Sequence, residues 1–219
     1  WYDYGARHYD AVLGRFTTND RFAEKYYSMS PYQYGANSPV GNIDVNGDSI
    51  IIKPNANGII DQIKVLFGYD TKFQKDVKAD LFQLKQDDKK VADIIGKLEE
   101  SKNIHYITMP KKGEYNSTGF NADKVKKNIS QGSEIYYNPY NRRRGRNDSD
   151  MRTPRIGLAH ELQHSFDVDK KVATYERTKN GILLMDIRAI NTENRIRKVI
   201  GEPKRTMYGT QKVPKELLE

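Results

Sequence analysis

The sequence contains no cysteine, which excludes disulfide bonds and thiolate metal sites. It has only four histidines, and no apolar run is long enough to cross a bilayer. The first ten residues, WYDYGARHYD, lack both the basic and the apolar region of a signal peptide. Any metal site must therefore use imidazole or carboxylate ligands, and we expect no membrane-spanning segment.

Basic residues outnumber acidic residues, but they are unevenly distributed. The formal net charge is +8, yet residues 1–48 carry four basic and six acidic side chains, whereas residues 140–219 carry eighteen and eleven. A basic C-terminal half is compatible with an acidic partner, a nucleic acid or a membrane surface, and equally with a solvated face.

The first 48 residues are rich in tyrosine and glycine. The tyrosines are Tyr2, Tyr4, Tyr9, Tyr26, Tyr27, Tyr32 and Tyr34, and the glycines are Gly5, Gly14, Gly35, Gly41 and Gly47. Aromatic residues between turn formers predict short strands and hairpins. So short a segment buries too little surface to fold alone, so we expect it to pack on something larger.

Two stretches of this segment, YDYGARHYDAVLGRFTTNDRFAEKY and SPYQYGANSPVGNIDVNG, resemble the end of the Rhs repeat-associated core of bacterial polymorphic toxins. The resemblance covers residues 1–47 and implies the last part of a β-rich shell, followed by a toxin domain in residues 48–219. It also implies delivery into a target cell by a bacterial secretion system, and a cognate immunity protein. The Asp-Pro-x-Gly autocleavage motif of many such proteins is matched by Asp44–Gly47, with Val45 in place of proline, which argues against self-cleavage.

Residues 48–219 alternate between strand and helix patterns and predict an α+β domain. We expect strands near 50–53, 103–110 and 133–141, and helices over 59–68 and 72–100. The run NRRRGRNDSDMR, residues 141–152, is polar and predicts a solvated loop that is also suited to gripping phosphate.

The stretch GLAHELQHSFD, residues 157–167, contains the clearest candidates for a metal-binding and catalytic site. Thr153 and Pro154 are suited to the start of a helix, where threonine can cap and proline lacks only an unused N–H group. His160 and His164 then lie one turn apart on one side of this helix and can reach one zinc ion. Glu161 is offset by about 100° and is placed to act on a zinc-bound water.

HELQH is the HExxH motif of the zincins, and random placement would give only ~0.004 such matches in a chain of this composition. Zinc lowers the pKa of its water, Glu161 takes the proton, and a peptide bond is hydrolysed. The sequence thus predicts a zinc metallopeptidase with Glu161 as its general base. Two surface histidines on a polar helix are the alternative interpretation.

A catalytic zinc needs a third protein ligand. Glu193 is the leading candidate, because it lies in a largely apolar stripe of the helical stretch MDIRAINTENRIRKVIG. It also follows His164 by 29 residues, a separation that suits a second helix running antiparallel to the first, as in gluzincins. Arg197, one turn later, is its alternative partner. Asp167 is the second candidate, better suited to orienting a histidine, and Asp169 is the third.

The tetrahedral intermediate also needs a partner for its oxyanion. Tyr208, Tyr175 and Arg205 lie in the right half of the chain, and we favour Tyr208, because it follows the helix that contains Glu193. The strand around Tyr136 and Tyr137 is expected either to form the sheet edge on which an extended peptide pairs or to belong to the core.

The arrangement over residues 59–208 also resembles NleD-like effector metallopeptidases, mainly through AHELQHSFD and, more weakly, through RAINTENRIRKVIGEPKRTMYG. The resemblance implies a zincin-like fold and a secreted protease that acts on a protein or peptide substrate. Two other classes remain open. One is a nuclease toxin that uses the basic C-terminal half. The other is a binding module with a structural metal, for which His8 and His105 lie far from the motif in sequence.

Overall fold

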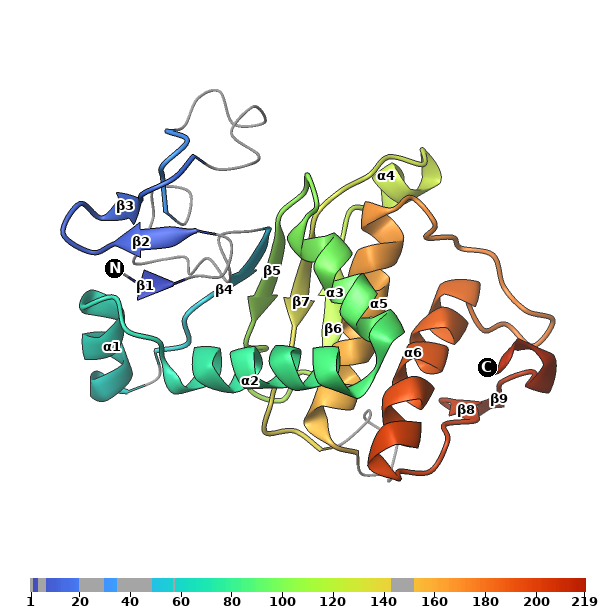
Figure 1. Ribbon diagram of the computed structural model, residues 1–219. Helices are drawn as coiled ribbons and strands as arrows, with labels where there is room; N and C mark the ends of the chain where they lie inside the picture. Colours follow the sequence, from blue (N-terminus) through green and yellow to red (C-terminus); the bar gives the residue numbers. More distant parts are fainter. Residues whose placement is uncertain (1, 4–6, 20–29, 35–48, 57, 143–151) are drawn as a thin grey trace.

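The computed structural model describes residues 2–3, 7–19, 30–34, 49–56, 58–142 and 152–219 (Figure 1). These residues form a small N-terminal sheet and a larger part that mixes helices with a second sheet, so the chain is an α+β protein. The matched autocleavage stretch Asp44–Gly47 and most of the basic loop expected over 141–152 lie outside the described residues.

The N-terminal sheet has three short antiparallel strands, β1 (Tyr2–Asp3), β2 (His8–Asp10) and β3 (Arg15–Phe16). The rings of Tyr9, Phe16 and Tyr34 pack together, with the centroids of Tyr9 and Tyr34 4.8 Å apart. Here the expected pattern of short strands with aromatic side chains is confirmed.

The described residues contain six α-helices, five of them in stretches where the sequence predicts a helix, whereas the short helix over residues 122–126 was not predicted. They are α1 (Ile59–Leu66), α2 (Lys72–Asp87), α3 (Lys89–Glu99), α4 (Ala122–Lys126), α5 (Pro154–Asp169) and α6 (Leu184–Ile200). The helical stretch expected over 72–100 is broken at Asp88, because its carboxylate accepts hydrogen bonds from the N–H groups of Lys90 and Val91 and caps α3. α6 ends at Gly201, which adopts the left-handed conformation with φ of 73°.

The second sheet has the order β4-β5-β7-β6. Strands β4 (Ile50–Ile52), β5 (His105–Thr108) and β7 (Ser133–Tyr136) are parallel, and β6 (Ser117–Gly119) runs antiparallel to β7 at one edge. The strand around Tyr136 is therefore interior, and of the two expectations for it, a place in the core sheet is confirmed. The strand beside the motif helix at the edge is β6.

The core lies between this sheet and helices α2, α3 and α5 (Figure 1). Its fully buried side chains include Ile52, Ile107, Ile135, Leu84, Ile95, Leu98, Leu158 and Leu162. A smaller cluster of Ile182, Ile187, Ile190 and Val213 holds the C-terminal segment against α6. That segment contains the hairpin of β8 (Met207–Tyr208) and β9 (Gln211–Lys212), followed by the 3-10 turn η3 (Lys215–Leu217).

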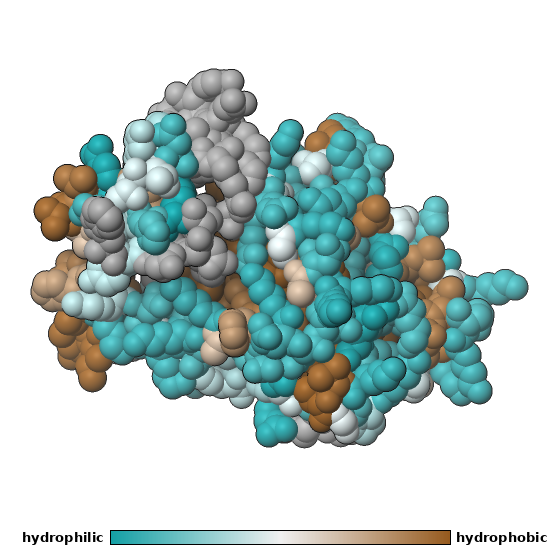
Figure 2. Space-filling view, viewed as in Figure 1, coloured by the Kyte–Doolittle hydropathy of each residue, from teal (hydrophilic) through white to brown (hydrophobic). Residues whose placement is uncertain are grey.

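Most of the visible surface is hydrophilic, with apolar patches that include the end of the molecule where α1 lies (Figure 2). Ile59, Ile60, Leu66 and Phe67 are each about 70% exposed or more there. In the described part of the chain, no helix is both long and apolar enough to cross a bilayer.

The central strand β5 provides a direct test of this core. Ile107→Ala removes a fully buried side chain from between two strands and three helices, and we expect it to lower the free energy of unfolding by about 2–5 kcal/mol. Phe82→Ala, on the exposed face of α2, should change it by less than about 0.5 kcal/mol. Urea denaturation followed by circular dichroism measures both, and equal effects would contradict the assigned core.

Candidate metal centre

Helix α5 carries the HELQH motif and is buried along most of its length. It begins at Pro154, as expected. Thr153, however, makes no capping hydrogen bond to the helix, because its hydroxyl donates to Oε1 of Glu202 instead. Gly157 allows the close approach of other residues, since a Cβ there would lie 2.6 Å from Nη2 of Arg152 and from Nδ2 of Asn116.

Helix α6 packs antiparallel to α5 (Figure 1). Asp186 lies in its first turn, and Glu193 lies seven residues later. Two helical turns, about 10.5 Å, therefore separate these carboxylates along one face. Because the helices run in opposite directions, Asp186 comes beside His164, and Glu193 comes beside His160.

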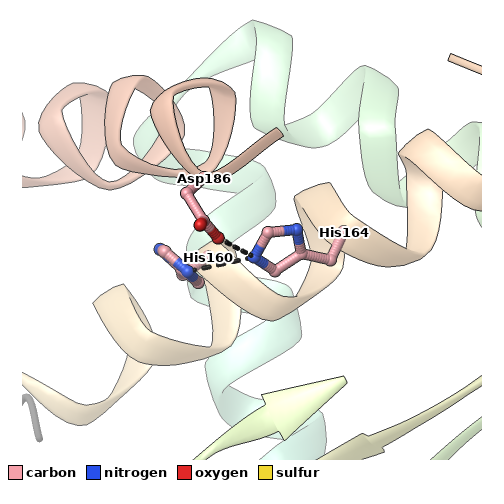
Figure 3. Close-up of side chains that lie close together, drawn as sticks. All are labelled: His160, His164 and Asp186. Carbon is pink, nitrogen blue, oxygen red and sulfur yellow. Dashed lines mark hydrogen bonds and ion pairs between the residues drawn. The ribbon is translucent and has the colours of Figure 1, made fainter. Parts of the chain in front are cut away.

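Three side chains converge between the two helices: His160, His164 and Asp186 (Figure 3). Nε2 of His160 lies 3.1 Å from Nε2 of His164, and Oδ1 of Asp186 lies 3.5 Å from Nε2 of His164. All three residues are less than 9% exposed. The two imidazoles thus direct the same nitrogen toward one point, and a carboxylate from the neighbouring helix meets them there.

These distances fit a metal ion. Two ligand atoms at 2.0–2.1 Å from a tetrahedral zinc lie about 3.3 Å apart, between the two observed separations. Burial above all, with the guanidinium group of Arg188 adding to it, lowers the pKa of His164 well below its ordinary value. His164 is therefore neutral at neutral pH, and a neutral imidazole is the form that binds metal.

Glu193, the expected third ligand, lies on the opposite side of the His160 ring. Its Oε1 is 2.9 Å from Nδ1 of His160, whereas the convergent group surrounds Nε2. A carboxylate at Nδ1 fixes the ring orientation and tautomer of a metal-binding histidine rather than binding the metal itself. The carboxylate beside the Nε2 atoms belongs to Asp186.

Three arginines surround the carboxylate of the completely buried Glu193. Nη1 of Arg205 and Nη1 of Arg152 lie 2.7 Å and 2.9 Å from Oε1 of Glu193, and Nε of Arg197 lies 3.7 Å from Oε2. Burial alone would raise the pKa of Glu193, but the guanidinium groups of Arg152 and Arg205 outweigh it and hold that pKa well below its usual range. Glu193 is therefore ionised at neutral pH.

Glu161 lies beside the convergent group and is itself buried. The hydroxyl of Thr118, on the edge strand β6, donates to Oε2 of Glu161 at 2.8 Å and contacts its backbone oxygen at 3.1 Å. Burial raises the pKa of Glu161, while His160, Thr118 and Arg152 oppose that effect. A carboxylate with a raised pKa holds a proton more readily, as a general base requires.

Of the three residues considered for the oxyanion, Tyr208 lies nearest to the convergent group. Its hydroxyl is hydrogen-bonded to Asp186, and burial together with this carboxylate raises its pKa, so it keeps its proton at neutral pH. Arg205 is engaged with Glu193. Tyr175 is 41% exposed.

The other candidates lie elsewhere. Asp167 accepts hydrogen bonds from Nε2 of Gln163 and Nε of Arg188, so it neither joins the convergent group nor orients a histidine in the described structure. Asp169 is bound by Ser101 and Asn103. His105, the first residue of β5, is fully buried with its Nδ1 2.9 Å from Oγ of Ser133, and it does not join the convergent group.

Asp186 is the member of the convergent group that was not predicted from the sequence. An acidic residue in the first turn of a helix is ordinarily explained by the helix dipole, which conceals any other role. Its spacing could have indicated it. Asp186 and Glu193 are seven residues apart and therefore share one face of α6, just as His160 and His164, four residues apart, share one face of α5.

The ion pairs of Glu193 should contribute to the free energy of unfolding. Glu193→Gln removes the carboxylate charge but keeps the shape, so the buried guanidinium groups of Arg152 and Arg205 lose the carboxylate with which they are in direct contact. We expect the metal-free protein to lose about 3–5 kcal/mol of unfolding free energy. Glu100→Gln, at the exposed end of α3, is the control and should have almost no effect. A neutral result for Glu193→Gln in urea denaturation would refute the charge balance described above.

The chain matches no protein-family model, no curated protein and no solved structure.

Proposed function

We propose that this chain is a zinc-dependent metalloendopeptidase with a zincin-like fold, in which His160, His164 and Asp186 hold the zinc. The observation that carries the proposal is the convergence of two Nε2 atoms 3.1 Å apart with a buried carboxylate oxygen, next to Glu161. The donor set of two imidazoles and one carboxylate is one that catalytic zinc sites use, and it leaves a fourth position for water or substrate.

Bound zinc would supply a Lewis acid and lower the pKa of an attacking water. Glu161 takes the proton of that water and later passes it to the leaving amine. Thr118 holds Oε2 of Glu161 from the sheet edge, which limits the motion of the carboxylate. Glu193 holds the ring of His160 from its Nδ1 side. The O–H group of Tyr208, which is hydrogen-bonded to Asp186 in this structure, turns to donate to the oxyanion that develops on the substrate.

The substrate is proposed to be a protein or peptide that pairs with strand β6. This strand is an edge of the sheet, and its residue Thr118 is bonded to the proposed general base. A peptide in extended conformation can pair with such an edge through main-chain hydrogen bonds. This arrangement brings a backbone carbonyl of the peptide next to Glu161.

The biological setting is proposed from residues 1–47 alone, because they resemble the end of an Rhs core. On this basis the peptidase is the C-terminal toxin of a larger shell-forming protein, delivered into a target cell by a bacterial secretion system. A cognate immunity protein and the shell of the parent chain are its expected partners.

Removing the general base should separate metal binding from catalysis. We expect Glu161→Gln to retain about one zinc per chain and to cleave peptides with a kcat reduced by about 10²–10⁴. Cleavage is measured by mass spectrometry on a peptide library prepared from a digested proteome. Plasmid DNA and tRNA are the control substrates and should remain intact. A Glu161→Gln variant as active as the wild type would exclude this mechanism.

The choice of third ligand has its own test in zinc affinity, measured by competition with a chelator. Asp186→Ala removes a proposed ligand and should abolish stoichiometric zinc binding. Glu193→Gln keeps all three proposed ligands but weakens the support of His160, and should weaken binding by about 10–100-fold. Asp167→Ala, the matched control on α5, should bind zinc as the wild type does. Zinc retained by Asp186→Ala and lost by Asp167→Ala would contradict the assignment.

The role of Tyr208 is tested by a substitution that keeps its ring and all three proposed zinc ligands, with zinc content measured alongside kcat. We expect Tyr208→Phe to lower kcat by about 10²–10³ with little change in KM, because only the hydroxyl that stabilises developing charge is lost. Tyr175→Phe is the control, since that ring is partly exposed and should not affect kcat. An unchanged kcat in Tyr208→Phe would remove this residue from the reaction.

A further inference from the structure

Strand β6 lies between two groups of lysines that the proposed reaction does not use. Residues 111–127 contain five lysines, Lys111, Lys112, Lys124, Lys126 and Lys127, and two acidic residues, Glu114 and Asp123. β5 and β6 point in opposite directions, so the segment that joins them lies at one end of β6 and helix α4 at the other. Each end of β6, an edge strand of the described sheet, is therefore next to one segment that carries lysines (Figure 1).

Both groups are held in place by the fold. The first follows β5 in a turn closed by the hydrogen bond from the N–H of Glu114 to the carbonyl of Lys111, while Oε2 of Glu114 accepts from the N–H of Lys111. The second lies on α4, where Asn121 caps the helix and is itself bound on both its N–H and its carbonyl by Gln131. The lysines thus extend from ordered backbone on either side of β6.

Most of these charges are not neutralised within the protein. In the described part of the chain, no carboxylate lies within 4 Å of Nζ of Lys111, Lys112, Lys124 or Lys127, and all four residues are exposed. Lys126 alone approaches an acidic group, Asp123, at 3.8 Å. The sheet edge next to Glu161 therefore has a net positive potential at each end, available to a ligand.

We propose that this edge selects acidic peptides, whose Asp or Glu side chains lie on both sides of the scissile bond and face the two lysine groups. This inference rests on the proposed peptidase function. Lys112 and Lys124 are each five residues from an end of β6, and an extended chain covers about 3.3 Å per residue. Acidic side chains up to about five positions from the cleaved bond are thus within reach.

The size of the preference follows from the exposure of the lysines. Exposed charge pairs contribute little individually and are screened beyond about 8 Å at physiological ionic strength. Several together should raise kcat/KM for acidic peptides by about three- to tenfold, chiefly through KM, and more at low salt. The chemistry at Glu161 is unaffected, so kcat for a given peptide should change little.

The test uses the full chain loaded with zinc. From the cleaved members of a proteome-derived peptide library, one peptide is resynthesised with its acidic residues replaced by the corresponding amides. We expect the amide form to show a kcat/KM about three- to tenfold lower in 20 mM salt and a difference that nearly disappears in 0.5 M salt.

The triple variant Lys112→Glu/Lys124→Glu/Lys127→Glu should lose or invert this preference. The control triple, Lys75→Glu/Lys89→Glu/Lys215→Glu, changes the net charge equally on α2, α3 and η3 and should retain it. Cleavage that ignores substrate charge in the wild type overturns the inference alone. A zinc-loaded wild type that cleaves no peptide overturns the proposed function and this inference with it. Binding of tRNA to the same three lysines in preference to the acidic peptide would assign the edge to nucleic acid instead.

Discussion

The antiparallel packing of α5 on α6 is the constraint on which the candidate site depends. The two acidic residues on α6 are two turns apart, and the two histidines on α5 are one turn apart. Asp186 therefore lies at Nε2 of His164, whereas Glu193 lies at Nδ1 of His160. A shift of one helix by a single turn would separate the groups by about 5.4 Å and destroy both contacts. The buried core beneath α5, including Leu158 and Leu162, fixes this alignment.

The buried carboxylates of the candidate site are compensated in two different ways. The site holds three carboxylates, Glu161, Asp186 and Glu193, which are expensive to bury in ionised form. Arg152 precedes α5 and Arg205 follows α6, and both neutralise Glu193. Glu161 and Asp186 have pKa values raised by burial instead. Glu193 is therefore ionised without a metal, whereas a bound cation would stabilise the ionised forms of Glu161 and Asp186.

The segment after α6 contributes more to the site than its irregular structure suggests. It carries Arg205 to Glu193 and Tyr208 to Asp186, and Val213 anchors it to the small apolar cluster on α6. The N–H of Arg205 and its carbonyl are both bound by the side chain of Asn194. The segment after α6 thus contacts both acidic residues of that helix, Glu193 and Asp186.

Much of this was predictable from sequence, because the relevant signals are local. Apolar periodicity, Pro154 and Gly201 define the motif helix and its partner, and strands β4, β5 and β7 follow from short apolar runs. Strand β6 was not predicted, because Ser-Thr-Gly carries no apolar alternation and pairs only through its neighbour β7. Asp186 was missed for a related reason: which carboxylate meets the histidines depends on how two helices are aligned, and no local pattern encodes that alignment.

The central claim is that His160, His164 and Asp186 bind one metal ion. A crystal structure of the zinc-loaded protein, with anomalous scattering recorded at the zinc edge, tests it most directly. We predict a single strong peak about 2.0–2.2 Å from Nε2 of both histidines and from a carboxylate oxygen of Asp186, with Glu193 remaining on Nδ1 of His160. A peak coordinated by Glu193 in place of Asp186, or no peak between α5 and α6, would contradict the claim.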